Sequence, residues 1–145
     1  MTSEEFLTSL EQENAARFER LVELRNGEYA NDRFVNLQLA RLYTKLNQFE
    51  ESEDALSQFI VRAERLDEKD PSAIASAYYD RACSQSLRWD KASDEEKGYL
   101  AVGIERDLLA AFKLDATSRR DARRPDPDFK NVQNLDWFKK LLRAP

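Results

Sequence analysis

Apolar side chains recur three or four residues apart along most of this 145-residue sequence. Between residues 35 and 46 they stand at Val35, Leu39, Leu42 and Leu46, the spacing of neighbours on one face of an α-helix. Only 3 Gly and 4 Pro interrupt the chain, and no stretch alternates apolar and polar residues as a strand does. The length suits one domain. We therefore predict a single all-α domain over residues 1–145.

Residues that begin or end helices divide the chain into segments. Thr2 begins a capping box, and Gly27 predicts a left-handed exit from the first helix. Asn47 predicts a tight turn, because Asn tolerates the left-handed conformation, and Asp70 with Pro71 starts a new helix. These signals predict an N-terminal helix over 1–27, a first helix pair over 31–70, a second pair over 71–116 with an exposed insertion at 90–98, and a basic segment with a C-terminal cap over 117–145.

The first helix pair resembles a repeat of the tetratricopeptide (TPR) family. It contains Leu39-Ala40-x-x-Tyr43, followed by Phe49, Ser52 and Leu56. In such a pair the small Ala40 lets the two helices approach closely, Tyr43 fills the space between them, and Ser52 is the small residue of the second helix. That second helix runs several residues past the family's 34-residue period.

Two later segments extend the resemblance to residues 31–142. Tyr78-Tyr79-Asp80-Arg81-Ala82-Cys83 is similar to the first helix of a repeat, and Leu108-x-x-Ala111-Phe112 to the end of a second helix. Asp126-Pro127-Asp128-Phe129 with Trp137-Phe138-x-x-Leu141-Leu142 resembles the closing segment of many bacterial TPR proteins. The resemblance implies a short right-handed solenoid of antiparallel helix pairs, with an extra N-terminal helix and a C-terminal capping helix.

A TPR-like fold implies a concave face that binds a protein or peptide. The side chains expected on it are Phe34, Leu37, Gln38, Arg41, Lys45, Tyr79, Asp80, Cys83 and Ser86. These residue types indicate an aromatic and aliphatic groove rimmed by Arg41, Lys45 and Arg81, suited to an apolar or acidic segment of a partner. The carboxylate clamp of chaperone-binding TPR proteins is not reproduced, because its positions hold Leu37, Arg41, Tyr79 and Cys83. We predict a non-catalytic adaptor or scaffold.

The absence of histidine from the sequence removes the usual general base and the commonest zinc ligand. The single cysteine, Cys83, therefore has no histidine to activate it, and we interpret it as a packing residue. Acidic runs at 50–54 and 94–96 lack the spacing of a calcium loop and are interpreted as solvated helix faces. Trp137 and Phe138 are expected in the core. We expect no catalytic residue, no metal and no cofactor.

Charge is distributed unevenly along the chain, whose net charge is -5. Residues 1–112 hold 14 basic and 23 acidic side chains, whereas residues 113–145 hold 9 basic and 5 acidic ones. The basic end includes Arg119, Arg120, Arg123 and Arg124. These arginines either neutralise the acidic body and the preceding helix end, or bind phosphates. The alternative function is thus a nucleic-acid-associated regulator acting through 119–124.

The start of the sequence lacks the basic residues and unbroken apolar run of a signal peptide. No apolar run approaches the roughly 18 residues of a membrane span, so we expect a cytoplasmic protein without a membrane partner. Two helix pairs are few for a solenoid, because each repeat needs neighbours that bury its faces. We therefore also predict either a closed form, in which the first helix covers an end, or a homo-oligomer.

Overall fold

The computed structural model describes residues 2–27, 33–65, 70–124 and 126–143, except for the side chains at positions 3, 6–11, 33 and 34. Over these residues the chain forms helices and no strand, which confirms the all-α prediction for them. The α-helices are α1 (Ser3–Asn26), α2 (Arg33–Lys45), α3 (Phe49–Arg65), α4 (Pro71–Leu87), α5 (Asp94–Leu114), α6 (Thr117–Arg123) and α7 (Asp136–Arg143). Two 3₁₀ turns, η1 (Trp89–Lys91) and η2 (Pro127–Phe129), lie between them.

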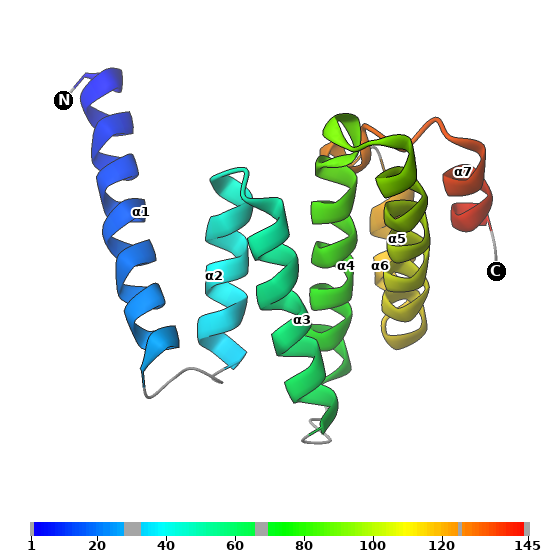
Figure 1. Cartoon of the computed structure of the whole chain (residues 1–145), viewed down its shortest axis with the longest axis horizontal. Coiled ribbons are helices and arrows are strands. Elements are labelled where there is room, and N and C mark those ends of the chain that lie inside the picture. Colours follow the sequence, from blue (N-terminus) through cyan, green and yellow to red (C-terminus); the bar gives the residue numbers. More distant parts are fainter. Residues whose placement is uncertain (1, 28–32, 66–69, 125, 144–145) are drawn as a thin grey trace.

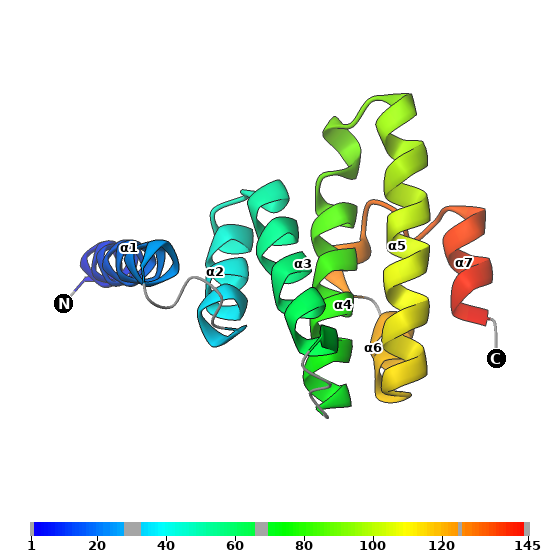
Figure 2. The same cartoon turned by 60° about the horizontal axis from the view of Figure 1, so that its bottom comes forward.

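The first five helices stand side by side in a row, each antiparallel to the next (Figures 1 and 2). Each packs on its neighbour along the chain, from α1 against α2 to α4 against α5. After α5 the chain turns back: α6 packs against α5 and α4, and η2 packs against α4. The last segment therefore covers one side of the α4–α5 pair, and α7 stands beside α5 at the end of the row (Figure 2).

The helix ends show which local signals control the backbone. The Thr2 hydroxyl accepts from the Glu5 N–H and the Glu5 carboxylate from the Thr2 N–H, both at 3.1 Å, which confirms the capping box. Asn47 has φ 60° between α2 and α3, so the predicted left-handed turn is confirmed. The same prediction for Gly27 is wrong, since its φ is -117°. Its N–H bonds to the carbonyl oxygen of Leu24 at 3.3 Å, which tightens the last turn of α1 instead of reversing it.

Most residues of the segment predicted as an exposed insertion, 90–98, are exposed, as expected. Residues 89–91 form η1, and α5 begins at Asp94, where the Ser93 hydroxyl caps it by accepting from the Glu96 N–H at 3.2 Å. The extra residues thus lengthen the helix pair, and α4 and α5 reach past the ends of α2 and α3 (Figure 2). The basic segment likewise forms a helix, α6.

The core consists of two groups of buried apolar side chains. One joins α2, α3 and α4 through Ala40, Ala55, Leu56, Phe59, Ile60 and Ala77. The other joins α4 and α5 to the returning C-terminal segment through Ala82, Cys83, Ile104, Leu108, Phe112, Ala122, Phe129, Val132, Phe138 and Leu141. Phe138 is buried and Trp137 half-buried beside Trp89, which confirms their core placement. The C-terminal residues therefore complete the core of the second helix pair.

Contacts between described side chains hold helix α1 to the row. The rings of Phe18 and Tyr43 meet edge to face at 5.2 Å. Arg17 donates to Gln38 at 2.9 Å, and Arg25 donates to Asp54 at 3.1 Å. These contacts place α1 at the end of the row, beside α2.

Candidate functional site

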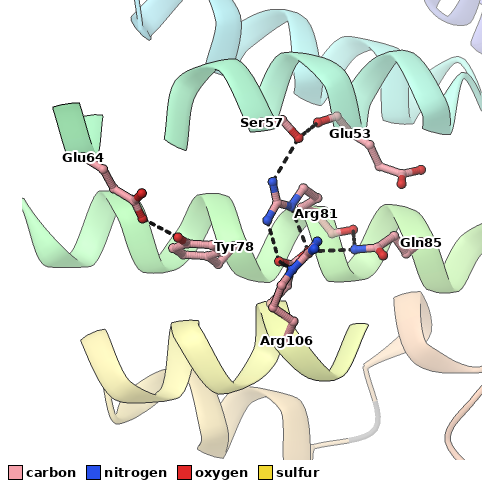
Figure 3. Close-up of polar contacts among 8 residues, drawn as sticks. Glu53, Ser57, Glu64, Tyr78, Arg81, Gln85 and Arg106 are labelled. Atoms are coloured by element: carbon pink, nitrogen blue, oxygen red, sulfur yellow. Dashed lines mark hydrogen bonds and ion pairs between the residues drawn. The ribbon is translucent and has the colours of Figure 1, made fainter. Parts of the chain in front are cut away.

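A buried polar group lies between α4 and α5 and is centred on Asp107, whose side chain is fully buried. Arg81 donates to the Asp107 carboxylate through Nε at 2.8 Å and Nη2 at 2.6 Å. Gln85 donates at 2.7 Å and Arg106 at 3.2 Å (Figure 3). This carboxylate is thus held by four hydrogen bonds, three of them from charged guanidinium groups.

The network continues from α4 to α3. Arg81 Nη1 donates to the Ser57 hydroxyl at 2.9 Å, and Tyr78 donates to Glu64 (Figure 3). Arg81 was predicted at the rim of a groove, and that placement is wrong. Its side chain is only 14% exposed, because Asp107 supplies a buried counter-charge. The network joins α3, α4 and α5, so we interpret it as stabilising the fold.

A second ion pair corrects the interpretation of the acidic run 50–54 as wholly solvated. Glu53 is 16% exposed and accepts from Arg88 through both of its oxygens, at 2.7 and 3.0 Å. Burial raises the pKa of Glu53, while Arg88 lowers it. Like the Asp107 network, this pair ties α3 to α4.

The candidate functional site is a cleft of about 680 Å³ between α1 and α2 on one side and α4 and η2 on the other. Its floor includes Ser52 and Leu56 of α3. The other lining residues are Arg17, Gln38, Ala40, Arg41, Leu42, Thr44, Lys45, Asp80, Cys83 and Asp128. A cavity of this volume lies within the range of ligand pockets.

The two sides of this cleft carry opposite charge. Arg17, Arg41 and Lys45, all exposed, lie on the α1–α2 side, whereas Asp80 and Asp128 lie on the α4–η2 side. Burial raises the pKa of Asp80 to about 6; the attraction of Arg41 opposes the rise, and the neighbouring aspartates add to it. Burial also raises the pKa of Asp128. The acidic side is therefore partly desolvated and the basic side is open to water.

Cys83 lies against the acidic side of the cleft and is buried. Burial, followed by the charges of Asp128, Asp80 and Asp126, raises the pKa of its thiol well above the ordinary value. A protonated thiol is a poor nucleophile, so this environment is opposite to that of an activated cysteine.

Potential ligand atoms of Cys83, Asp126 and Asp128 lie within 4.8 Å of one another and could in principle hold a cation. Both oxygens of Asp126 already accept hydrogen bonds, one from the Asp128 N–H at 2.9 Å and the other from Tyr79 at 2.6 Å. We assign no metal to these residues.

The structure brings part of the predicted groove together. Gln38, Arg41, Lys45, Asp80 and Cys83 line the cleft, while the side chain of Phe34 lies outside the described residues. The other predicted residues pack elsewhere: Leu37 against the α2–α3–α4 core, Tyr79 on the ring of Phe129, and Ser86 in full burial. Binding by the lining residues stays a prediction.

Among the lining residues that were not predicted, Arg17 and Asp128 are the charged ones. They come from α1 and η2, outside the two helix pairs for which a groove was expected. Sequence reasoning had no local signal for either, because each reaches the cleft through tertiary packing.

The four arginines of the basic segment do not form a single free surface. The Arg119 guanidinium lies 4.9 Å over the ring of Phe112, and Arg123 donates to the carbonyl oxygen of Leu142 at 2.8 Å. Arg120, Arg123 and Arg124 are exposed. Two of the four side chains thus hold α6 to its neighbours, and nucleic-acid binding stays a prediction.

No helix in the described part of the chain combines the length and apolar character needed to cross a membrane. Compared with models of protein families, with curated proteins and with solved structures, the chain matches none of them. A functional assignment therefore depends on the geometry and chemistry of the cleft.

Proposed function

We propose that this chain is a non-catalytic protein-binding module, built as a short TPR-like right-handed solenoid, whose cleft holds a segment of a partner protein. The observation that carries the proposal is the cleft of about 680 Å³ with a basic side on α1–α2 and an acidic side on α4–η2. Opposed charges provide orientation and specificity for a bound segment.

Helix packing beneath the cleft supports the TPR-like part of the proposal. Ala40 and Ser52 are both buried where α2 and α3 meet. The Ser52 hydroxyl donates to the Ala40 carbonyl oxygen at 2.9 Å, so the two helices lie in direct contact there. This close approach at two small residues is what the resemblance implies. The first helix of each pair, α2 and α4, contributes to the cleft, as expected of a concave face.

The lining indicates what the bound segment must carry. Arg41 and Lys45 offer exposed cationic groups, which favour an acidic side chain. Leu42 and Leu56, both almost fully buried, line the cleft next to them and make that part of its lining apolar. We therefore expect a segment with an acidic residue beside an apolar one, the apolar side chain lying over Leu56.

Selection from random peptides displayed on phage, followed by fluorescence anisotropy with labelled synthetic peptides, tests the proposal. Wild-type protein should enrich peptides with adjacent acidic and apolar residues. The double variant Arg41→Glu, Lys45→Glu should bind them about tenfold or more weakly, because two attractions become repulsions. The control Arg62→Glu, Arg65→Glu makes the same change of charge at exposed positions of α3 and should bind as wild type does.

Two results would overturn the proposal. One is a selection in which no sequence is enriched over a protein-free control. The other is enrichment of peptides that bind equally to wild type and to the Arg41→Glu, Lys45→Glu variant, which would place binding outside the cleft.

A further inference from the structure

Exposed apolar side chains are concentrated on one helix. Among the residues that the structure describes, the large apolar side chains that are exposed are Leu46, Val61, Tyr99, Val102, Leu109 and Leu114. Tyr99, Val102 and Leu109 are 74%, 67% and 42% exposed and are spaced three and seven residues apart on α5. At 3.6 residues per turn this spacing places them on one face.

The same face of α5 continues as a regular stripe in both directions. Glu95, Arg106 and Lys113, which are exposed, complete a pattern of alternating four- and three-residue steps with the three apolar residues. This is the spacing of the contact positions in a coiled coil. Leu100, Ile104 and Leu108 of α5 face the core instead. Helix α5 is therefore apolar on two sides, one of them open to solvent, which is typical of a helix that packs against a further element.

The order of residues in the stripe is complementary to itself when reversed. In an antiparallel pair centred level with residue 104, Glu95 of one copy faces Lys113 of the other at each end. Tyr99 then faces Leu109, and Val102 faces the aliphatic stem of Arg106. A parallel pair would place Glu95 opposite Glu95 and Lys113 opposite Lys113. The charge pattern thus favours a second copy of this chain, bound in the antiparallel orientation.

We propose that two copies of this chain associate through the outer stripe of α5, defined by Glu95, Tyr99, Val102, Arg106, Leu109 and Lys113, with the two helices antiparallel about a two-fold axis. A two-fold axis makes each residue contact occur twice, so each contact contributes twice to the interface. The cleft is lined by residues of α1 to α4 and η2, so this surface does not overlap with it. The inference is therefore independent of the proposed function.

The size of the stripe sets the expected strength. Residues 95 to 113 extend over about 27 Å along the helix. A contact along one helix face is smaller than a standard protein interface, so the dimer belongs to the weak class. We expect it to form over a concentration range of about 10 µM to 1 mM.

Sedimentation velocity over that range tests the surface. Wild type should shift from monomer to dimer, whereas Tyr99→Glu should remain a monomer, because it places a carboxylate against Leu109 of the other copy in each of the two symmetric Tyr99–Leu109 contacts. Val61→Glu is the matched control: Val61 is 54% exposed on α3, and the variant should dimerise as wild type does. Far-UV circular dichroism should show unchanged helicity in both variants. A wild type that is monomeric at 1 mM, or a Tyr99→Glu variant that still dimerises, would overturn the proposal.

Charge reversal tests the orientation. Glu95→Lys and Lys113→Glu, each alone, place like charges at both ends of the antiparallel pair and should weaken dimerisation about tenfold. The double variant Glu95→Lys, Lys113→Glu restores opposite charges and should return it to near the wild-type strength. If these residues serve only the dipole of their own helix, the double variant will be the least stable and its association will not recover. Failure of the double variant to recover would refute the antiparallel arrangement.

Discussion

Substitution of Arg81 by Met removes the buried ion-pair partner of the Asp107 carboxylate. Arg81 supplies two of the four hydrogen bonds to this fully buried group, at 2.8 and 2.6 Å. Removal of one partner of a buried ion pair costs about 3–5 kcal/mol, because the remaining charge stays in a medium of low polarity. Gln85 and Arg106 continue to donate to Asp107. We therefore expect a loss of about 3 kcal/mol in the free energy of unfolding.

The double variant Arg81→Met, Asp107→Leu separates the cost of an uncompensated charge from the loss of the pair itself. With both charges of the pair removed, no unpaired charge of this pair stays buried between α4 and α5, and the Gln85 amide, which loses Asp107, still donates to the Arg81 carbonyl oxygen at 3.2 Å. Replacement of a buried ion pair by apolar residues is often neutral or stabilising. We expect the double variant to be more stable than Arg81→Met by about 2 kcal/mol. Arg88→Met is the control: its partner Glu53 is 16% exposed and can be hydrated, so the loss should be smaller, about 1 kcal/mol.

Urea unfolding followed by the fluorescence of Trp89 and Trp137, and by circular dichroism, measures these free energies. Both tryptophans lie against the core of the second helix pair, so their emission reports its unfolding. The reasoning would be refuted by a cost below about 1 kcal/mol for Arg81→Met, or by a double variant that is no more stable than Arg81→Met.

Three further predictions concern single positions. Gly103→Ala should lower the free energy of unfolding, measured by thermal unfolding, by about 1–2 kcal/mol despite the helix propensity of Ala, because the new Cβ would lie 1.9 Å from Gln85 Oε1. In a protein that already carries Gln85→Ala, the same Gly103→Ala substitution should raise the free energy of unfolding. Asn47→Ala should lower the free energy of unfolding by about 1 kcal/mol and Asn47→Gly should leave it unchanged, because φ is 60° at this position. Equal losses for the two variants would contradict this prediction. The pKa of Asp80 is raised from 3.8 to about 6, so its ionised form lowers stability at pH 7 and the loss disappears as pH falls through 6 toward 4. Asp80→Asn should thus gain about 1–3 kcal/mol at pH 7.5 and nothing near pH 4 in urea unfolding; a gain independent of pH would contradict it.

The elements of this fold were predictable because their signals are local. The apolar spacing of Val35, Leu39 and Leu42 and the cap at Thr2 depend on residues within four positions of each other, and the structure has helices where they indicate. Asn47 was predictable for the same reason, since its left-handed conformation is a property of the turn itself.

The predictions that were wrong concern groups for which more than one hydrogen-bond partner was available, either a side chain or a backbone N–H. Arg81 lies between Asp80 and Cys83, which line the cleft, so a rim position was a reasonable prediction from helix geometry. Its actual direction is set by Asp107 on α5, which no short-range pattern relates to it. The end of α1 gives a second example. A glycine at position 27 is compatible with a left-handed reversal of the chain and also with the observed bond from its N–H to the carbonyl oxygen of Leu24.

What the sequence by itself determined is the all-α class, most of the helices with the capping box at Thr2 and the turn at Asn47, and the absence of histidine, because all of these follow from residue type and spacing within a few turns. Only the tertiary structure decided which charges meet. Arg17, Asp80 and Asp128 enter one cleft from α1, α4 and η2, and Asp107 acquires its cations inside the core. The physical reason is that a buried charge is tolerated only beside its partner, and burial itself exists only once distant helices have packed together.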